Sequence, residues 1–542
     1  MGLVEIWRSA LARLHLALTG TRLPEQSHGD ARASLLAFVI ALAAFGFELG
    51  NPGLGVDDYL HLGMEVTWNE FWVGRGMWGG VLLHYLVPGG WIVPFITLLI
   101  GIFCQLTTAV VLGWLIGLHR IGVPARALIY SVFVIFPFFS AQMAFSHLQI
   151  GYSLASLLCV MGLFGAASCT RSWPRLVVSS VLIAMGFSTY QGCLSVLATA
   201  AVAAVSAGLH SRIPLDRHRV ARRAGNIGLA IAAGGLLYLL IHKLIIWSAG
   251  ISPPSDYYSV SWQLAFWERW DLIEPQISFL LLGCGGLVPT GAVLLFLLAA
   301  VFAAGDWIVR RPPPVVVAGG LMLGLALVLA PFSVLFLHAS RLAPRSSLGA
   351  AVVWVVVFAA LASSASRTTR WFGNISVSLV VLSFVFQSNQ VFYSQNLVAQ
   401  ADRTMIARIA ERIDVIDTNP RMEGRPRVVV VGSYSHPHYP GISRYHNSVL
   451  GFSNFEWHGG NELRVQALAA SVGVDRYDWF AADAVGSPAA VERMLQGRAP
   501  WPSADSVFIH DDKIVVWLGL RREPTFDEDP VRSFFARISA GS

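Results

Sequence analysis

Charged residues are scarce in this sequence. They make up 13% of the 542 residues, whereas soluble proteins contain about 25%. Lysine is almost absent: all of the 38 basic residues except Lys243 and Lys513 are arginine. Together with 55% hydrophobic residues and a mean hydropathy of +0.59, this composition excludes an ordinary soluble protein and indicates many transmembrane helices.

Several sequence signals are also missing, and each absence excludes a class of protein. The five cysteines lie in or beside apolar segments, in an odd number and without metal-site spacing, so no disulfide framework is expected. No A-x-A cleavage site follows the first apolar run, which indicates a retained span and not a signal peptide. The absence of G-x-S-x-G argues against a serine nucleophile. The net charge of +6 comes mostly from arginines in short loops, so it reflects membrane topology and not nucleic-acid binding.

The apolar segments predict a polytopic α-helical membrane protein with about eleven transmembrane helices. The expected spans are 33–49, 91–117, 127–140, 150–169, 176–189, 192–209, 225–249, 286–304, 315–337, 346–362 and 373–392.

The charge of the loops then assigns the two sides of the membrane. The N-terminal segment 1–32 and one alternating set of loops carry 17 arginines, and the opposite set carries four. Because positive residues stay in the cytoplasm, the arginine-rich set is predicted to be cytoplasmic, and its short loops leave no room for a nucleotide-sugar domain. The transmembrane region is therefore 33–392, its longest outer loops are 50–90 and 250–285, and 393–542 is expected outside as a soluble domain.

This C-terminal segment is predicted to be a small α/β domain. A helix over 395–416 precedes the apolar strand RVVVVG (427–432), and SVFIH-DDK-IVVWL (506–517) is typical of a hairpin. The glycine after the strand does not begin a G-x-G-x-x-G motif, so a nucleotide site there is poorly supported. Four histidines of this segment lie close together in sequence but without the spacing that is specific for a metal, namely His436, His438, His446 and His458.

Ionisable residues at the edge of a bilayer are costly, and their default interpretation is functional. In this sequence they gather on the predicted outer side. An acidic residue can act as a general base on a sugar hydroxyl, and arginine or lysine can hold a phosphate. We expect these groups to meet in one cavity that opens toward lipid, where a lipid-linked phosphate reacts. The candidates are Asp57, Asp58 and Arg75 in the first outer loop, Tyr190 and Gln191 in FSTYQG, His242 and Lys243 in YLLIHKLIIW, and Arg341 and Arg345 in HASRLAPRS.

The same residues also have structural interpretations, which the sequence leaves open. Asp57 can cap the helix that begins near Tyr59, although a cap does not need a second carboxylate. The outer arginines and Lys243 can extend to lipid headgroups. The Tyr-Gln turn at 190–191 can satisfy backbone groups at a break between two helices, and the aromatic residues of the first outer loop can anchor it at the membrane interface.

In their order and sidedness, these elements resemble a known family. They are an outer-loop Asp-Asp after the first span, a Gly-Arg-x-x-Trp element at 74–78, the Tyr-Gln turn and a late arginine in a short outer turn. This combination resembles the GT-C superfamily of polytopic glycosyltransferases, and more narrowly the O-antigen glucosyltransferase II family of serotype-converting phages and bacteria. The resemblance extends from about residue 33 into the 450s and includes NQVFYSQN (389–396), but the tail beyond about 460 resembles no known family.

The resemblance implies a GT-C-like fold in the bacterial inner membrane with a periplasmic tail. It implies that polyprenyl-phosphate-glucose donates its sugar, with inversion, to lipopolysaccharide O-antigen or a lipid-linked glycan at the outer face. Some GT-C branches use a divalent cation, none is required here, and no other cofactor is implied. In the implied site Asp57 or Asp58 is the base, with Glu48 as a further acidic candidate. The donor phosphate is bound by Arg75, Lys243, Arg341 and Arg345. The substrate is contacted by Trp78, Tyr190, Gln191 and His242.

Two other functions remain as alternatives. A transporter or flippase of lipid-linked glycans would also carry charges within its spans, but no inverted repeat is detectable and a large outer domain fits poorly. A lipid A-modifying transferase of related fold could move aminoarabinose or phosphoethanolamine. The second of these reactions usually needs a metal-bound threonine nucleophile in a large soluble domain, which the sequence does not contain.

Overall fold

The computed structural model describes most of the chain. The described residues are 3–21, 29–55, 57–59, 65–87, 89–168, 172–209, 217–251, 266–283, 286–309, 314–338, 343–416, 425–436, 451–456, 462–474 and 476–520. The chain divides into two compact units, which we describe separately. The helical unit comprises Met1–Gly50, Glu70–Met143 and His147–Asn389, and the tail unit comprises Asn51–Asn69, Ala144–Ser146 and Gln390–Ser542.

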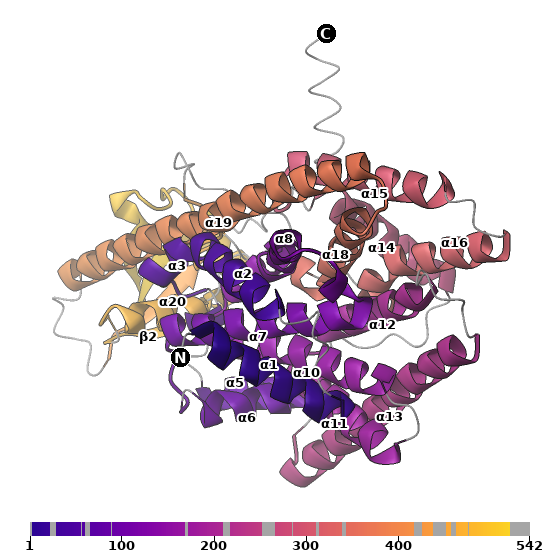
Figure 1. Cartoon of the computed structure of the whole chain (residues 1–542). Coiled ribbons are helices and arrows are strands. Elements are labelled where there is room, and N and C mark those ends of the chain that lie inside the picture. The colour runs from indigo at the N-terminus through magenta and orange to yellow at the C-terminus, as the bar shows by residue number, and fades with distance from the viewer. Residues whose placement is uncertain are drawn as a thin grey trace. The chain divides into compact units, whose positions relative to one another are not determined.

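The helical unit consists of helices joined by turns (Figure 1). Two of its helices, α5 and α19, also contain residues of the tail unit. The helices are α1 (Leu3–Thr19), α2 (Asp30–Ala44), α3 (Gly46–Gly50), α5 (Glu65–Gly74), α6 (Trp78–Leu86), α7 (Pro94–Ile116), α8 (Val123–Val134), α9 (Pro137–Met143), α10 (Gln149–Ser168), α11 (Trp173–Thr189), α12 (Cys193–Leu209), α13 (Arg217–Ala249), α14 (Phe266–Leu281), α15 (Thr290–Val309), α16 (Pro314–Leu329), α17 (Ser333–His338), α18 (Gly349–Ala362) and α19 (Arg367–Ile416).

Six helical segments among the described residues are long and apolar enough to cross a bilayer, and a bent pair makes a seventh if it acts as one span. The six are Pro94–Ile116, Gln149–Ser168, Val220–Ala249, Thr290–Val309, Val317–Leu337 and Arg367–Ile416. Three further predicted spans lie on shorter apolar helices, namely α11, α12 and α18. The chain is therefore a mostly helical protein with several long apolar helices, as in a membrane protein, and the count of eleven spans remains a prediction.

The bent pair shows how one residue shapes the helical unit. The segment predicted as a single span over 127–140 forms α8 and α9, which meet at 50°. Pro137 begins α9, and proline has no backbone N–H and clashes with the carbonyl four residues earlier, so the first helix ends before it. The expected span over 127–140 is therefore a bent pair of helices and not one continuous helix.

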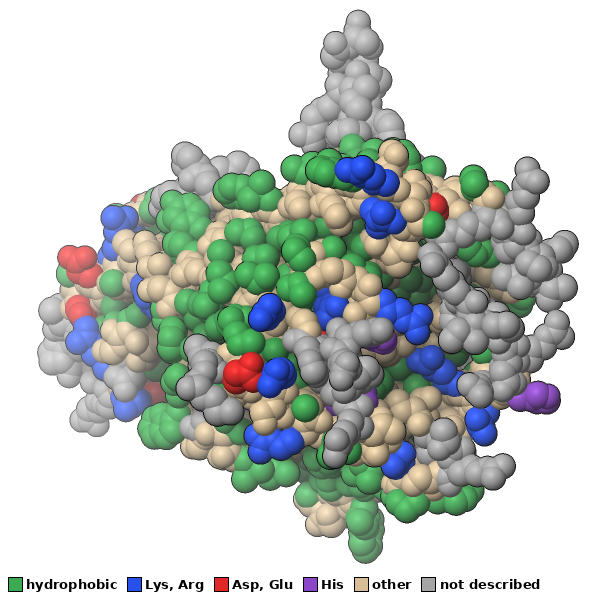
Figure 2. Space-filling view, viewed as in Figure 1, with side chains coloured by type: hydrophobic (Ala, Val, Ile, Leu, Met, Phe, Trp, Pro, Cys, Tyr) green, Lys and Arg blue, Asp and Glu red, His purple; other side chains and the backbone are tan. Residues whose placement is uncertain are grey.

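Large apolar side chains lie on the surface of the helical unit. Only 17% of the apolar window of Thr290–Val309 and of Val220–Ala249 is buried, against 72% of that of Gln149–Ser168. Figure 2 shows hydrophobic side chains over much of the visible face. Apolar surface of this extent is unfavourable in water, and this favours lipid as the surroundings of these exposed faces.

A buried ion pair lies at the N-terminal end of α2. Arg126 Nη1 lies 2.6 Å from Asp30 Oδ1, and both side chains are almost fully buried. The carboxylate also accepts hydrogen bonds from Trp114 Nε1 at 2.9 Å and from the Tyr130 hydroxyl at 2.9 Å. Asp30 thus has partners for both oxygens, which a buried charge requires. Arg126 is therefore a packing residue, although it is one of the 17 arginines from which the cytoplasmic side was predicted.

One helix is longer than the sequence predicted. The apolar stretch 373–392 and the helix over 395–416 were expected to be separate, but α19 runs without a break for 50 residues. No glycine or proline lies between 385 and 400, so nothing ends the helix where its apolar stretch stops.

The tail unit contains a four-stranded sheet with strand order β2-β1-β4-β3. The strands are β1 (Arg427–Val431), β2 (Asp478–Phe480), β3 (Val507–His510) and β4 (Lys513–Trp517). β1 pairs in parallel with β2 and β4, and β3 pairs with β4 as the antiparallel hairpin that the sequence predicted. The helices are α20 (Glu462–Ser471), α21 (Pro488–Leu495) and the C-terminal part of α19.

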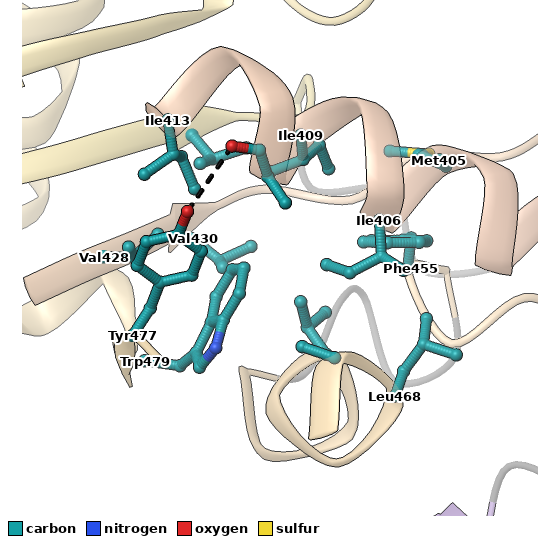
Figure 3. Packing of buried hydrophobic residues seen from close by; sticks show 14 of the residues in the cluster. Met405, Ile406, Ile409, Ile413, Val428, Val430, Phe455, Leu468, Tyr477 and Trp479 are labelled. Carbon is teal, nitrogen blue, oxygen red and sulfur yellow. Dashed lines mark hydrogen bonds between the residues drawn. The ribbon is translucent and has the colours of Figure 1, made fainter. Parts of the chain in front are cut away.

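The sheet has two apolar faces because side chains alternate along β1. Val428 and Val430 pack on one face against α19 and α20, in a cluster that includes Ile406, Ile409 and Leu468 (Figure 3). Val429, Val431, Phe508 and Val515 face the other side, against α21. This two-residue period is that of a strand buried on both faces. The segment therefore folds as an α/β unit.

Candidate functional site

Two motifs that the sequence singled out lie together in the helical unit. The Gln191 side chain donates a hydrogen bond from Nε2 to the backbone oxygen of Arg75, at 2.6 Å. The same nitrogen donates to the Tyr238 hydroxyl on α13, also at 2.6 Å. Gln191 thus joins the Arg75 turn (residues 74–78) to α13. Tyr238 was missed by the sequence analysis.

The glycines of the Arg75 turn are required by this close contact. Gly76 has a φ of +84°, and a Cβ on it would lie 2.0 Å from the Tyr238 hydroxyl. A Cβ on Gly79, in the first turn of α6, would lie 2.2 Å from the Ser188 hydroxyl near the end of α11. Small residues let helices approach closely inside membranes. The glycine-rich sequence GRGMWGG therefore packs directly against FSTYQG.

Two buried polar atoms, one on the Arg75 turn and one on α13, have no partner among the described residues. The Arg75 Cζ lies 3.8 Å from the centre of the Phe71 ring, a cation–π contact that orients the guanidinium. The indole N–H of Trp78 and Nδ1 of His242 are buried and have no hydrogen-bond partner within the described residues. His242 lies parallel to the Tyr238 ring at 6.0 Å. Buried polar atoms without partners are uncommon, and a bound substrate is one way to satisfy them.

The Tyr-Gln turn contacts a second arginine-bearing segment on its other side. Burial raises the pKa of the Tyr190 phenol, while the charge of Arg345 and hydrogen bonds from Ser346 and Gln142 act in the opposite direction. The Gln142 side chain also donates to the backbone oxygen of Arg345, at 3.4 Å. The neighbouring residues Tyr190 and Gln191 therefore contact the Arg345 segment and the Arg75 turn, respectively.

The two adjacent carboxylates belong to the tail unit and differ in their surroundings. Asp58 is fully buried, and its Oδ2 accepts hydrogen bonds from the backbone N–H of Gly55 at 2.6 Å and of Ser146 at 3.0 Å. Asp57 keeps 19% of its side chain exposed, and its Oδ1 lies 3.0 Å from Nη2 of Arg464. Asp58 thus holds the loop in place, whereas Asp57 keeps part of its carboxylate accessible.

A second buried carboxylate in the tail unit was not identified from the sequence. Asp402 on α19 accepts hydrogen bonds from His436 Nε2 at 2.7 Å and from the Ser453 hydroxyl at 2.5 Å. Asn454 donates from its backbone N–H at 2.7 Å and from its side chain at 3.0 Å. The signal in the sequence was an acid on the apolar face of a helix, three residues before Met405. His436 is therefore paired with a carboxylate, and His438, His446 and His458 lie outside the described residues.

The remaining predicted residues are placed as follows. Lys243 is exposed on α13, next to the exposed apolar residues Leu240 and Leu244. Glu48 is buried in α3, and Arg341 lies outside the described residues. Across the described chain, no group of three or more histidine, cysteine, aspartate or glutamate side chains has the arrangement of a metal site.

A family model described as glucosyl transferase GtrII matches residues 47–364, more than half of the chain. This protein belongs to the GtrII glucosyl transferase family. The match includes the Asp57–Asp58 pair, the Arg75 turn, the Tyr-Gln turn and Arg345, and it confirms the resemblance drawn from these motifs. It ends before α19, so the C-terminal segment lies outside the matched residues. Comparison with curated proteins and with solved structures gives no match.

Proposed function

We propose that this GtrII protein transfers glucose from a polyprenyl-phosphate donor to a polysaccharide of the O-antigen type at the outer face of the inner membrane. The observation that carries the proposal is the pair of hydrogen bonds by which Gln191 joins the Arg75 turn to α13, inside the segment that matches the glucosyl transferase family. The long apolar helices are consistent with a donor that resides in the same bilayer.

Asp57 is the proposed general base. Its carboxylate accepts the proton of the acceptor hydroxyl while that oxygen attacks the anomeric carbon of the donor glucose. The bond between this carbon and the phosphate oxygen breaks, and polyprenyl phosphate leaves with the electron pair. Attack from the face opposite the leaving group inverts the anomeric configuration. The partial exposure of Asp57 supports this role, and the backbone contacts of the buried Asp58 support a structural one.

The leaving phosphate needs cations, and the proposed ones are Arg75, Arg345, Arg341 and Lys243. Arginine can bind two phosphate oxygens at once, and lysine acts as a point charge. An exposed lysine on an apolar helix can reach the level of the lipid headgroups, where the donor phosphate lies. The unpartnered N–H of Trp78 and Nδ1 of His242 are proposed to bind sugar hydroxyls, with Tyr190 and Gln191 positioning the turns.

The side of the membrane is proposed from two independent observations. The loop charges support a location of the first outer loop and the tail on the same side, opposite the arginine-rich loops. Residues 51–69 and 390–542 also fall in one compact unit, which is expected when both lie on the same side.

The test is donor consumption by the purified protein in lipid nanodiscs. Polyprenyl phosphates that carry glucose, galactose or mannose are supplied separately with an O-antigen acceptor, and UDP-glucose and the Asp57→Asn variant serve as controls. We expect only the glucose lipid to be consumed, and only by the wild type. Use of UDP-glucose, or failure to consume any lipid donor, would overturn the proposal. Movement of lipid-linked glycan between leaflets without consumption would instead indicate a carrier.

A further inference from the structure

Arg464 lies in a position that is unfavourable for an isolated arginine. It belongs to the first turn of α20, which begins at Glu462, and its side chain is only 4% exposed. The N-terminus of a helix carries a partial positive charge, so a cation there is repelled, and burial adds a desolvation cost. A residue that contradicts its local preferences in this way indicates a functional or strained site.

Asp57 is an anionic partner of Arg464 that offsets part of these costs. Arg464 Nη2 donates to Asp57 Oδ1 at 3.0 Å, across 407 residues of sequence. The second oxygen of Asp57 has no hydrogen-bond partner within the described residues. The guanidinium therefore holds the carboxylate by one oxygen and leaves the other for a substrate proton.

The backbone that carries Asp57 is fixed on both sides. Asp58 bonds to the N–H groups of Gly55 and Ser146, and a Cβ on Gly55 would lie 2.6 Å from the backbone oxygen of Ala144. Tyr59 is 1% exposed and belongs to the same apolar cluster as β1 and α20. With the backbone fixed, the remaining freedom of Asp57 is that of its own side chain, and Arg464 is the group that restricts it.

We propose that Arg464 is a positioning residue for Asp57, so that the C-terminal segment completes the catalytic site even though it lies outside the GtrII-matching residues. The inference rests on the proposed function. A carboxylate that rotates freely has its oxygen in the correct position for only part of the time. Because Arg464 restricts this rotation, the inference assigns the tail a part in the transfer reaction. Arg464 does not contact the substrate phosphate in this role, so its loss affects turnover and not donor binding.

The experiment compares Arg464→Met, which keeps the length of the aliphatic stem, with Arg464→Lys, which keeps the charge. Arg476→Met is the matched control, because Arg476 forms an exposed ion pair with Asp414 in the same unit. We expect Arg464→Met to lower kcat by about tenfold or more with an unchanged KM for the lipid donor, and Arg464→Lys to recover most of this loss. Arg476→Met should leave kcat within about twofold of wild type, as expected for an exposed ion pair.

A double variant separates positioning from a structural role. Asp57→Asn combined with Arg464→Met should be no slower than Asp57→Asn alone, because the two residues act as one unit. If Arg464→Met does not fold, Arg464→Gln, which keeps a hydrogen-bond donor but no charge, takes its place in both comparisons.

The inference is overturned if Arg464→Met and Arg464→Gln retain full kcat. It is also overturned if Arg464→Lys is as slow as these two variants and all three show the same loss of thermal stability. A wild type that consumes no lipid donor refutes the proposed function and this role with it. That result is distinct from failure of the inference alone, in which the wild type turns over normally.

Discussion

Gly76→Ala tests whether the contact between the Arg75 turn and the Tyr-Gln turn matters for function. The new methyl group would lie 2.0 Å from the Tyr238 hydroxyl and 2.7 Å from Nε2 of Gln191, well inside contact distance. The chain offers a matched control in Gly117, which has the same φ of +84° and nothing within 4 Å of its Cβ. Both substitutions incur the same backbone strain, and only Gly76→Ala disturbs the site.

The expected magnitudes follow from these contacts. Placing alanine in the left-handed region costs about 1–2 kcal/mol, and both variants should show this loss. Gly76→Ala must in addition displace Tyr238 or Gln191, which removes two hydrogen bonds worth about 1 kcal/mol each. The total for Gly76→Ala is then about 3–4 kcal/mol. Displacement of Arg75 by about 1 Å should also reduce kcat/KM by about 100-fold, because misplacement of a binding group by this distance has that effect in enzymes.

The assay is thermal unfolding in detergent together with donor consumption in nanodiscs. We expect Gly117→Ala to retain the kcat/KM of the wild type within about twofold, since its methyl group enters open space. The reasoning would be refuted if Gly76→Ala were as stable and as active as Gly117→Ala, because the close approach to Tyr238 would then have no consequence.

Three further outcomes are expected. Asp57→Asn should lower kcat by about 100-fold or more with little change in thermal stability. Asp58→Asn should mainly lower stability, because the buried Oδ2 of Asp58 accepts hydrogen bonds from two backbone N–H groups. The reverse pattern in the two assays would exchange their roles. Burial raises the pKa of Tyr477 to about 12 from an ordinary value of 10.0, so the folded form holds this proton more tightly. The stability that this difference contributes is complete below pH 10 and is lost as the pH rises toward 12. Denaturant unfolding should show a smaller alkaline loss of stability in Tyr477→Phe than in the wild type, and equal losses would contradict the burial argument. Lys243→Ala and Arg345→Ala should each raise the KM for the lipid donor by about tenfold, measured over a series of donor concentrations, and an unchanged KM in either variant would remove that residue from the phosphate site.

Much of the helical unit could be predicted because the length of each apolar segment can be read directly from the sequence. Each predicted span coincides with one or more helices, and the arginines at their ends mark the boundaries. Two features could not be predicted from hydropathy. Pro137 bends a segment whose composition is uniformly apolar, and α19 continues after its apolar stretch because helix formation does not depend on hydropathy.

The candidate site was predictable in part. Arg75 and Gln191 were found because polar residues are conspicuous at the ends of apolar helices, and the structure places them in contact. Tyr238 was missed because a tyrosine in an apolar helix has the appearance of an ordinary packing residue. Arg464 and Asp402 were missed for a different reason. Their partners lie far away in sequence, and only the fold of the tail unit brings them together.

The burial of Tyr59 in the apolar cluster of the tail unit has a practical consequence. An isolated fragment 390–542 would lack this side chain and would expose the hole that it fills, so we expect such a fragment to aggregate or to remain partly unfolded. Chimeras that join this tail to another GtrII protein face the same difficulty. They should succeed only when the loop at 51–59 is transplanted with the tail that encloses it, and the two segments should be inherited together for that reason.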